Sequence, residues 1–330
     1  MRGSRTVKER IFLAEKTDQI YFVSQWVKDK FFEGLPYNHR NNCEILYPAI
    51  KPLKKLSNKK KLIIFTGKLN SSKGYDIFGK AIIKILDKHN QWKAVAIGNE
   101  PREKFNFVHK NFKVIDWIQH DKILKYYLSA SISVVPSKWL EPFGRTAMES
   151  AAYGCATITS RNGGLPETFD NTLFLKKTNS EEIFKLIDLL IKNQKKRNLI
   201  QKKNFSNVKH KLKYKVDKID DLKKFFLNSK FNYNKNTKLK ILHISQFDER
   251  NNYRLFNISI SNKLSKGFIR NEHDVINFSY RDFLNRTFIR GKHDTLNSKV
   301  LEIVDNYRPN LIVLGHNNFL YSNNLELIKS

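Results

Sequence analysis

Short apolar segments alternate with amphipathic stretches along the chain between residues 61 and 159. Apolar segments of four to six residues predict buried strands, and apolar positions three and four residues apart predict helices. The predicted strands are 62–65, 92–97, 112–117, 132–135 and 156–159, and the predicted helices are 75–86, 120–130 and 144–152. This alternation predicts an α/β fold with a Rossmann-like, doubly wound parallel sheet, whose ligands bind at the carboxyl ends of its strands.

The pattern changes on either side of this region. Residues 19–24 predict a short strand, and residues 25–33 predict a helix. Residues 181–227 predict helix throughout, and the part over 192–215 holds ten Lys or Arg and no Asp or Glu. Two interpretations of this basic run stay open: a solvated helical face, or a surface that binds an anionic membrane or another polyanion.

A second α/β pattern follows residues 228–237, a polar segment without periodicity that we interpret as a linker. Its predicted strands are 239–245, 275–278 and 311–314, and its predicted helices are 255–265 and 295–305. Residues 238–330 are fewer than a complete Rossmann-like domain usually needs. We therefore expect the start of a second, incomplete Rossmann-like module.

Composition narrows the function classes. The chain of 330 residues has 61 Lys or Arg against 31 Asp or Glu, a net charge of +30 that attracts anions of every kind. No zinc-finger spacing or RNA-recognition signature is present, so nucleic-acid binding is not favoured. The two cysteines, Cys43 and Cys155, are too few for a disulfide framework. With no long apolar run and no apolar signal segment, we expect a cytoplasmic protein.

The most informative segment runs from residue 134 to 168 and contains E-P-F-G-R-T-A-M-E. Glu141 lies in a loop after a predicted strand, and Gly144 opens the next helix, whose free N–H groups favour an anionic or hydroxyl-rich ligand. Glu149 lies on the second turn of that helix. Both carboxylates can face one crevice and accept hydrogen bonds from sugar hydroxyls. The later pair Gly163-Gly164 permits a tight turn with close backbone approach at the next strand end.

A second motif, F-T-G-K-L-N-S-S-K-G, follows the strand at 62–65. Gly67 is followed by two lysines, Lys68 and Lys73, before the next helix begins. Two ammonium groups and loop amides suit a diphosphate. By themselves these lysines are more typical of a solvated surface than of a binding site. The segment is neither a Walker A loop nor a dinucleotide-binding fingerprint.

Together these motifs resemble those of retaining glycosyltransferases of group 1 (family 4). E-P-F-G-R-T-A-M-E is similar to the family's E-x-F-G-x-x-x-x-E signature, and G-K-L-x-x-S-K-G and G-G-L-P-E also match in order. The resemblance implies the GT-B fold, in which two Rossmann-like domains face a cleft. It also implies a nucleoside diphosphate sugar as donor substrate and no bound metal or cofactor.

The resemblance also implies roles for single residues. Lys68 is a departure, because the family often has Arg there and Lys lacks its bidentate fork. The implied residues are Glu141 for catalysis, Gly67, Lys68 and Lys73 for the donor diphosphate, Phe143, Gly144 and Glu149 for the donor sugar and ribose, and Trp117 and Ile118 beside the nucleobase.

The resemblance divides the chain into four parts. Residues 1–40 resemble the tail end of an otherwise missing N-terminal GT-B domain, and residues 41–227 resemble the donor-binding domain. After the linker, residues 238–330 resemble the start of a CgeB-type glycosyltransferase. We therefore expect a fragment of a longer tandem enzyme.

The expected function is a hexosyltransferase-type reaction in polysaccharide or glycoconjugate synthesis. The enzyme would move a sugar, with retention, to a glycan or lipid-linked acceptor, at times in peripheral contact with the inner membrane face. Two alternatives stay open: a nucleotide-sugar-binding fragment without transfer activity, or a basic protein that binds anionic surfaces.

Overall fold

The computed structural model describes residues 6–17, 19–36, 42–50, 53, 55–169, 173–206, 217, 237–247, 259–286, 292–315, 320 and 324–325. The chain divides into two compact units. The larger unit is Thr17–Phe225, and the smaller unit combines Met1–Lys16 with Phe226–Ser330. No helix in the described ranges is both long and apolar enough to cross a membrane.

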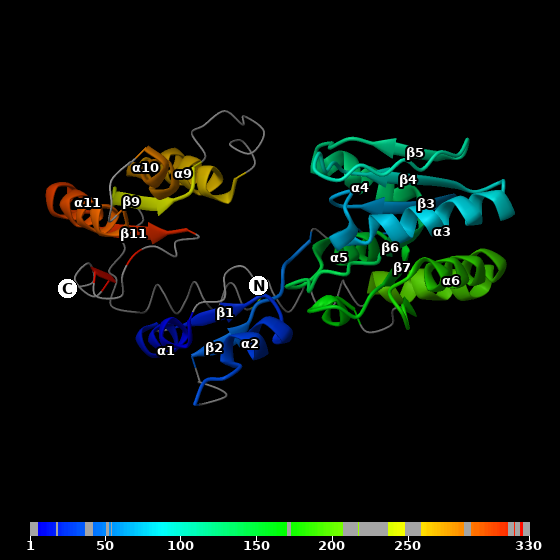
Figure 1. Cartoon of the computed structure of the whole chain (residues 1–330), viewed down its shortest axis with the longest axis horizontal. Helices are drawn as coiled ribbons and strands as arrows, with labels where there is room; N and C mark the ends of the chain where they lie inside the picture. The colour runs from blue at the N-terminus through cyan, green and yellow to red at the C-terminus, as the bar shows by residue number, and fades with distance from the viewer. Residues whose placement is uncertain are drawn as a thin grey trace. The chain divides into compact units, whose positions relative to one another are not determined.

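The larger unit is built on a six-stranded parallel sheet with the order β5-β4-β3-β6-β7-β8 (Figure 1). Its strands are β3 (Lys60–Thr66), β4 (Lys93–Ile97), β5 (Phe112–Ile115), β6 (Ala130–Val135), β7 (Ala156–Thr159) and β8 (Leu173–Phe174). The chain moves outward from β3 to β5 and then returns to place β6 against β3. The predicted doubly wound parallel sheet is confirmed, and its order reverses between β3 and β6, where such sheets bind ligands.

Helices cover both faces of this sheet because its strand residues alternate between two cores. Ile63 and Phe65 of β3 pack in the same core as α3 (Tyr75–Lys88) and α6 (Ser180–Lys192). Ile64 packs in the opposite core, with α4 (His120–Ser129) and α5 (Arg145–Ala152). This two-sided burial explains why β3 and β4 are almost continuously apolar in the sequence.

The larger unit begins with a small parallel sheet and a helix. β1 (Ile20–Phe22) pairs with β2 (Cys43–Ile45), and α2 (Gln25–Phe32) lies between them in the chain. Ser24 caps α2, because its side chain accepts a hydrogen bond from the N–H of Val27. The predicted strand and helix are confirmed, whereas β2 and β8 are additions that the sequence did not predict.

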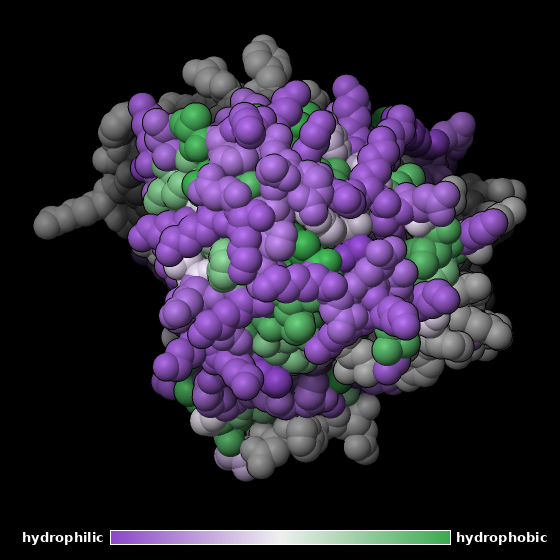
Figure 2. Space-filling view, turned by 90° about the vertical axis from the view of Figure 1, so that its right-hand side faces the viewer, coloured by the Kyte–Doolittle hydropathy of each residue, from purple (hydrophilic) through white to green (hydrophobic). Residues whose placement is uncertain are grey.

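The predicted helix over 181–227 is interrupted at Asn193. α6 ends there, and the Asn193 side chain accepts from the N–H of Lys196 to start a second helix over residues 194–206. The rest of the prediction, apart from residue 217, lies outside the described residues. The face of the molecule drawn in Figure 2 is mainly hydrophilic, with apolar side chains scattered over it.

The smaller unit has a three-stranded parallel sheet in the order β10-β9-β11. Its elements are α1 (Val7–Lys16), β9 (Lys240–Ser245), α9 (Ile260–Arg270), β10 (Asp274–Ser279), α10 (Tyr280–Arg286), α11 (Lys292–Tyr307) and β11 (Leu311–Leu314). The three predicted strands are confirmed. The helix predicted over 255–265 starts at Ile260 among the described residues and continues to Arg270, while α1 and α10 were not predicted. Of the predicted linker over 228–237, residues 228–236 lie outside the described residues.

Candidate functional site

A cavity of about 410 Å³ opens at the carboxyl ends of β3 and β6, where the strand order reverses. This is the position at which an open α/β sheet binds its ligands. Five of the residues that the sequence singled out line it: Gly67, Lys73, Glu141, Phe143 and Gly144. The two motifs, which are separated by more than sixty residues in the sequence, therefore form one site.

Two glycines allow the ends of β3 and β4 to approach each other closely beside the cavity. Gly67 has φ +145° and donates its N–H to the carbonyl of Ile97, at 3.1 Å. Gly98 has φ +154°, and a Cβ atom there would lie 1.8 Å from the carbonyl oxygen of Gly67. The two strand ends therefore approach so closely that a side chain at Gly98 would push the loop away.

The turn that carries Lys73 is held in place by a side-chain cap. The Asn70 side chain accepts a hydrogen bond from the N–H of Lys73, at 3.0 Å. Gly74 follows in the left-handed conformation, and a Cβ atom there would lie 2.1 Å from the carbonyl oxygen of Pro136. The turn thus packs directly on the loop after β6, which brings Lys73 to the cavity.

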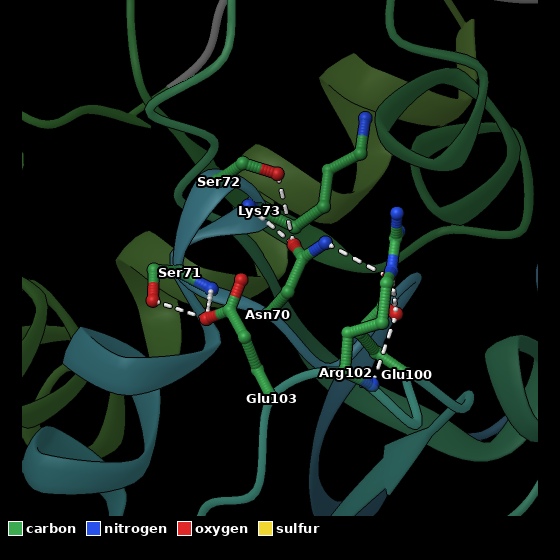
Figure 3. Close-up of polar contacts among 7 residues, drawn as sticks. All are labelled: Asn70, Ser71, Ser72, Lys73, Glu100, Arg102 and Glu103. Atoms are coloured by element: carbon green, nitrogen blue, oxygen red, sulfur yellow. Dashed lines mark hydrogen bonds and ion pairs between the residues drawn. The ribbon is translucent and has the colours of Figure 1, made fainter.

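An ionic network supports the other side of this turn (Figure 3). Arg102 donates two hydrogen bonds to Glu100, at 2.7 and 2.8 Å, and these bonds lower the pKa of Glu100 to about 2. Glu100 in turn accepts from the Asn70 amide, at 3.3 Å, and Glu103 accepts from the N–H of Ser71, at 2.9 Å. Figure 3 shows the Lys73 side chain extending away from this network, so its ammonium group is left for the cavity.

Lys73 and Glu141 form an ion pair in the cavity. The distance from Lys73 Nζ to Glu141 Oε1 is 2.6 Å, and the two side chains are 30% and 14% exposed. The backbone of Glu141 is held by the Gly163-Gly164 turn, since Gly164 donates its N–H to the Glu141 carbonyl, at 2.7 Å. A Cβ atom on Gly163 would lie 2.2 Å from that same oxygen. The close backbone approach predicted for this glycine pair is therefore confirmed.

Glu149 is buried on α5 and is not among the described residues that line the cavity. Its Oε1 lies 3.1 Å from Arg145 Nη2 and 3.2 Å from His120 Nε2. His120 is the first residue of α4, and its spacing from the motif gives no sign of this contact. Arg145 itself lines the cavity, and Gly144, at φ +102°, precedes α5 so that the first N–H groups of that helix lie beside it.

The remaining predicted site residues lie at the same carboxyl edge of the sheet but do not line the cavity. Lys68 is exposed in the loop after β3. Trp117 is 43% exposed two residues after β5, and Ile118 follows it. The N–H of Trp117 donates to Asp116 Oδ1, at 2.5 Å, which orients this strand end.

Sequence reasoning missed the contribution of the N-terminal segment. Val23, directly after β1, and Pro48, three residues after β2, line the cavity. Ser24 donates its hydroxyl to the carbonyl of Pro142, at 2.5 Å, beside the glutamate of the motif. These contacts join residues about 120 positions apart, and no local sequence signal announces them.

The positive charge at the cavity comes from Lys73, Arg145 and the start of α5. In the described part of the chain, no three His, Cys, Asp or Glu side chains converge as metal ligands would. The arrangement can bind an anionic ligand, and its carboxylate and backbone groups can accept hydrogen bonds from hydroxyls.

Residues 48–206 match the family described as Glycosyl transferases group 1. An uncharacterized glycosyltransferase of Methanocaldococcus jannaschii is 33% identical over 113 residues, which cover 32% of this chain and 29% of that protein. A D-inositol 3-phosphate glycosyltransferase of Corynebacterium jeikeium is 27% identical over 124 residues, which cover 33% of this chain and 29% of that protein. The chain spans about a third or less of the length of these curated relatives.

Solved structures share the fold. HepE of Anabaena, in complex with UDP-glucose, superposes with a TM-score of 0.53 at 13% identity, over 67% of this chain and 70% of that one. A glycosyltransferase of Rickettsia africae superposes with a TM-score of 0.55 at 18% identity, over 67% and 68% of the two chains. The parallel α/β architecture is thus that of GT-B-type glycosyltransferases. Residues 48–206 of this chain are thus similar to the group 1 glycosyltransferases.

Proposed function

We propose that the chain takes part in the transfer of a sugar from a nucleoside diphosphate sugar to a glycan or lipid-linked acceptor. The observation that carries this proposal is the cavity at the strand-order reversal, where Lys73, Glu141 and the start of α5 converge. The family match supports it, and so does the complex of the structural neighbour HepE with UDP-glucose. We also propose that the sugar is a hexose, that its configuration is retained, and that the reaction serves polysaccharide or glycoconjugate synthesis.

In this proposal the donor diphosphate lies over the loop after β3. Gly67 leaves room for the phosphates, Lys73 supplies an ammonium group in the cavity, and Lys68 supplies a second one from the exposed edge. These cations would stabilise the negative charge that grows on the leaving nucleoside diphosphate. Trp117 and Ile118, at the end of β5, would flank the nucleobase.

The sugar end of the donor lies at the start of α5 in this proposal. Glu141 is the residue at the reaction centre, and Phe143 and Gly144 form the turn that faces the transferred sugar. Glu149 would accept hydrogen bonds from the ribose. Because Glu149 now contacts Arg145 and His120, this role requires that the carboxylate keep a free lone pair or exchange one of those partners for a hydroxyl.

The domain roles are also part of the proposal. Residues 41–227 would bind the donor, and residues 1–40 would correspond to the end of an acceptor-side domain. The parallel order β10-β9-β11 supports a second Rossmann-like module over residues 238–330, for which we propose a CgeB-type glycosyltransferase. We propose a cytoplasmic location, with peripheral contact at the inner membrane face.

The test is a calorimetric titration of the chain with UDP, GDP, ADP and their sugar conjugates. Saturable binding of one nucleotide, weakened about tenfold or more in Lys73→Ala, is expected because charge-assisted hydrogen bonds contribute about 1.5–3 kcal/mol. Lys80→Ala, which alters an exposed lysine of α3, is the matched control and should leave the affinity unchanged. Nucleotide binding that is equal in Lys73→Ala and the wild type would contradict the assignment.

Two other functions make different predictions in the same experiment. A nucleotide-sugar-binding fragment would bind the donor normally but show no turnover with any acceptor. A basic protein for anionic surfaces would adsorb to acidic lipid with a steep salt dependence and without nucleotide preference. The exposed lysines of the helix over 194–206, Lys195, Lys196, Lys202 and Lys203, are the observation that favours this last candidate.

A further inference from the structure

Glu167 closes the G-G-L-P-E segment, and its carboxylate caps a helix from a distant part of the chain. Glu167 Oε2 accepts from the N–H of Gln25, at 2.6 Å, and Glu167 Oε1 accepts from the N–H of Trp26, at 2.8 Å. These are the first two N–H groups of α2, which no carbonyl of the helix can satisfy. A negative charge at this end also interacts favourably with the helix dipole.

The capped turn forms part of the wall of the cavity. Val23, two residues before Gln25, lines the cavity, and the intervening Ser24 donates its hydroxyl to the carbonyl of Pro142. Pro142 is also a lining residue. The first turn of α2 is therefore attached both to Glu167 and to the loop that carries Glu141.

A second connection runs through Tyr47. Its hydroxyl donates to Glu167 Oε2, at 3.1 Å, and its ring packs on Phe143, with ring centroids 5.6 Å apart. The next residue, Pro48, lines the cavity. One carboxylate thus holds the two segments that bring Val23 and Pro48 to this wall.

The turn that carries Glu167 also touches the start of α5. Glu167 ends the 3₁₀ turn η2 (Leu165–Glu167), and Leu165 packs so closely on Gly144 that a Cβ atom there would lie 2.4 Å from Leu165 Cδ2. A shift of η2 would therefore move the helix start that faces the proposed sugar position. Glu167 connects the backbone on both sides of the cavity.

We propose that Glu167 is a positioning residue for the donor cavity: by binding the first turn of α2 and Tyr47, it holds Val23 and Pro48 at the distance that a nucleoside diphosphate sugar requires. This inference rests on the proposed function of the same cavity. The Glu167 carboxylate binds Gln25, Trp26 and Tyr47, none of which lines the cavity, so it acts on the cavity through these partners.

The test compares Glu167→Gln with Glu181→Gln in the full chain. Glutamine keeps the length of the side chain but replaces one acceptor oxygen by an NH₂ group and removes the charge, so only one of the two α2 bonds can form. Glu181 is the matched control, since its side chain is 76% exposed on the first turn of α6. Hydrogen exchange at the amides of residues 25–27 and calorimetric titration with UDP, GDP and ADP are measured on both variants and the wild type.

We expect faster exchange at residues 25–27 and about fivefold or more weaker nucleotide binding in Glu167→Gln, with Glu181→Gln unchanged in both. If Glu167→Gln melts at a lower temperature but its folded form binds the nucleotide like the wild type, Glu167 only stabilises the fold and the proposal is overturned. Exchange equal to that of the wild type also overturns it. A wild-type chain that binds none of the three nucleotides contradicts the proposed function; faster exchange in Glu167→Gln then still supports the clamp on α2.

Discussion

The Lys73–Glu141 ion pair leads to a prediction with opposite signs for its two partners. Glu141 Oε1 lies 2.6 Å from Lys73 Nζ, the ammonium group that we propose binds the donor diphosphate. The carboxylate and the diphosphate therefore compete for the same ammonium group. Glu141→Gln should raise the affinity for a free nucleoside diphosphate, whereas Lys73→Ala should lower it.

The size of the effect follows from the geometry of the pair. A hydrogen bond between two charged groups is at the upper end of about 1.5–3 kcal/mol, and the glutamine amide can still accept from the ammonium group but without the ion pair, so replacing the carboxylate weakens the competing bond by about 0.5–2 kcal/mol. Because the Lys73 side chain is 30% exposed, solvent screens part of this difference. An increase in affinity of about fivefold, near 1 kcal/mol, is expected for Glu141→Gln.

The assay is calorimetric titration of UDP, GDP and ADP into the wild type, Glu141→Gln and Lys73→Ala, with thermal unfolding to verify that each variant is folded. Sugar transfer, measured with the sugar conjugate and an acceptor, should fall in Glu141→Gln although the nucleotide binds more tightly. A loss of nucleotide affinity in Glu141→Gln as large as that in Lys73→Ala would refute the competition.

Two further predictions concern stability. Gly98→Ala should lower the free energy of unfolding, measured in urea, by about 2 kcal/mol or more, because the new Cβ atom would clash with the Gly67 carbonyl at a positive φ. Gly267→Ala in α9 is the control: there is open space around this position, so the substitution should raise the free energy of unfolding by about 0.5–1 kcal/mol. Equal effects of the two substitutions would contradict this reasoning. Burial alone would raise the pKa of Asp188, but hydrogen bonds from His89 and two lysines lower it to about 2, below its ordinary 3.8. The ionised Asp188 carboxylate therefore stabilises the fold above about pH 4, and this contribution is lost as the pH falls from 4 to 2. Over that range the free energy of unfolding of the wild type should fall by about 1 kcal/mol more than that of Asp188→Asn, after allowance for solvent screening. Parallel curves of stability against pH for the two proteins would show that these hydrogen bonds do not stabilise the fold.

Most strands of the larger sheet could be predicted because the apolar residues that identify each strand are neighbours in the sequence. β3 contains the apolar run L-I-I-F, and β6 ends in I-S-V-V with every residue buried, so a few neighbouring positions are enough to identify each of them. β2 and β8 have three and two residues, too few to form a pattern, and they exist because β1 and β7 pair with them. The missed helix α1 is rich in charged residues and has one buried position, Ala14, so it lacks a clear apolar stripe.

For the candidate site too, the sequence identified residues but not the contacts between them. The motifs identified Lys73, Glu141 and Gly144, and the structure brings these three to one cavity. The motifs did not indicate that Lys73 and Glu141 touch, nor that Glu149 contacts Arg145 and His120. These contacts depend on side-chain directions, which residue type and spacing do not define.

The sequence by itself determined the type of most elements, the doubly wound α/β class and the residues of both motifs, because apolar period and loop chemistry act over a few neighbouring positions. The tertiary structure alone decided the strand order that places β6 beside β3, and with it the cavity between their ends. It also decided that Glu167 binds α2 from about 140 residues away. Such contacts arise only when packing of the sheet brings distant loops together, since no local interaction favours one distant partner over another.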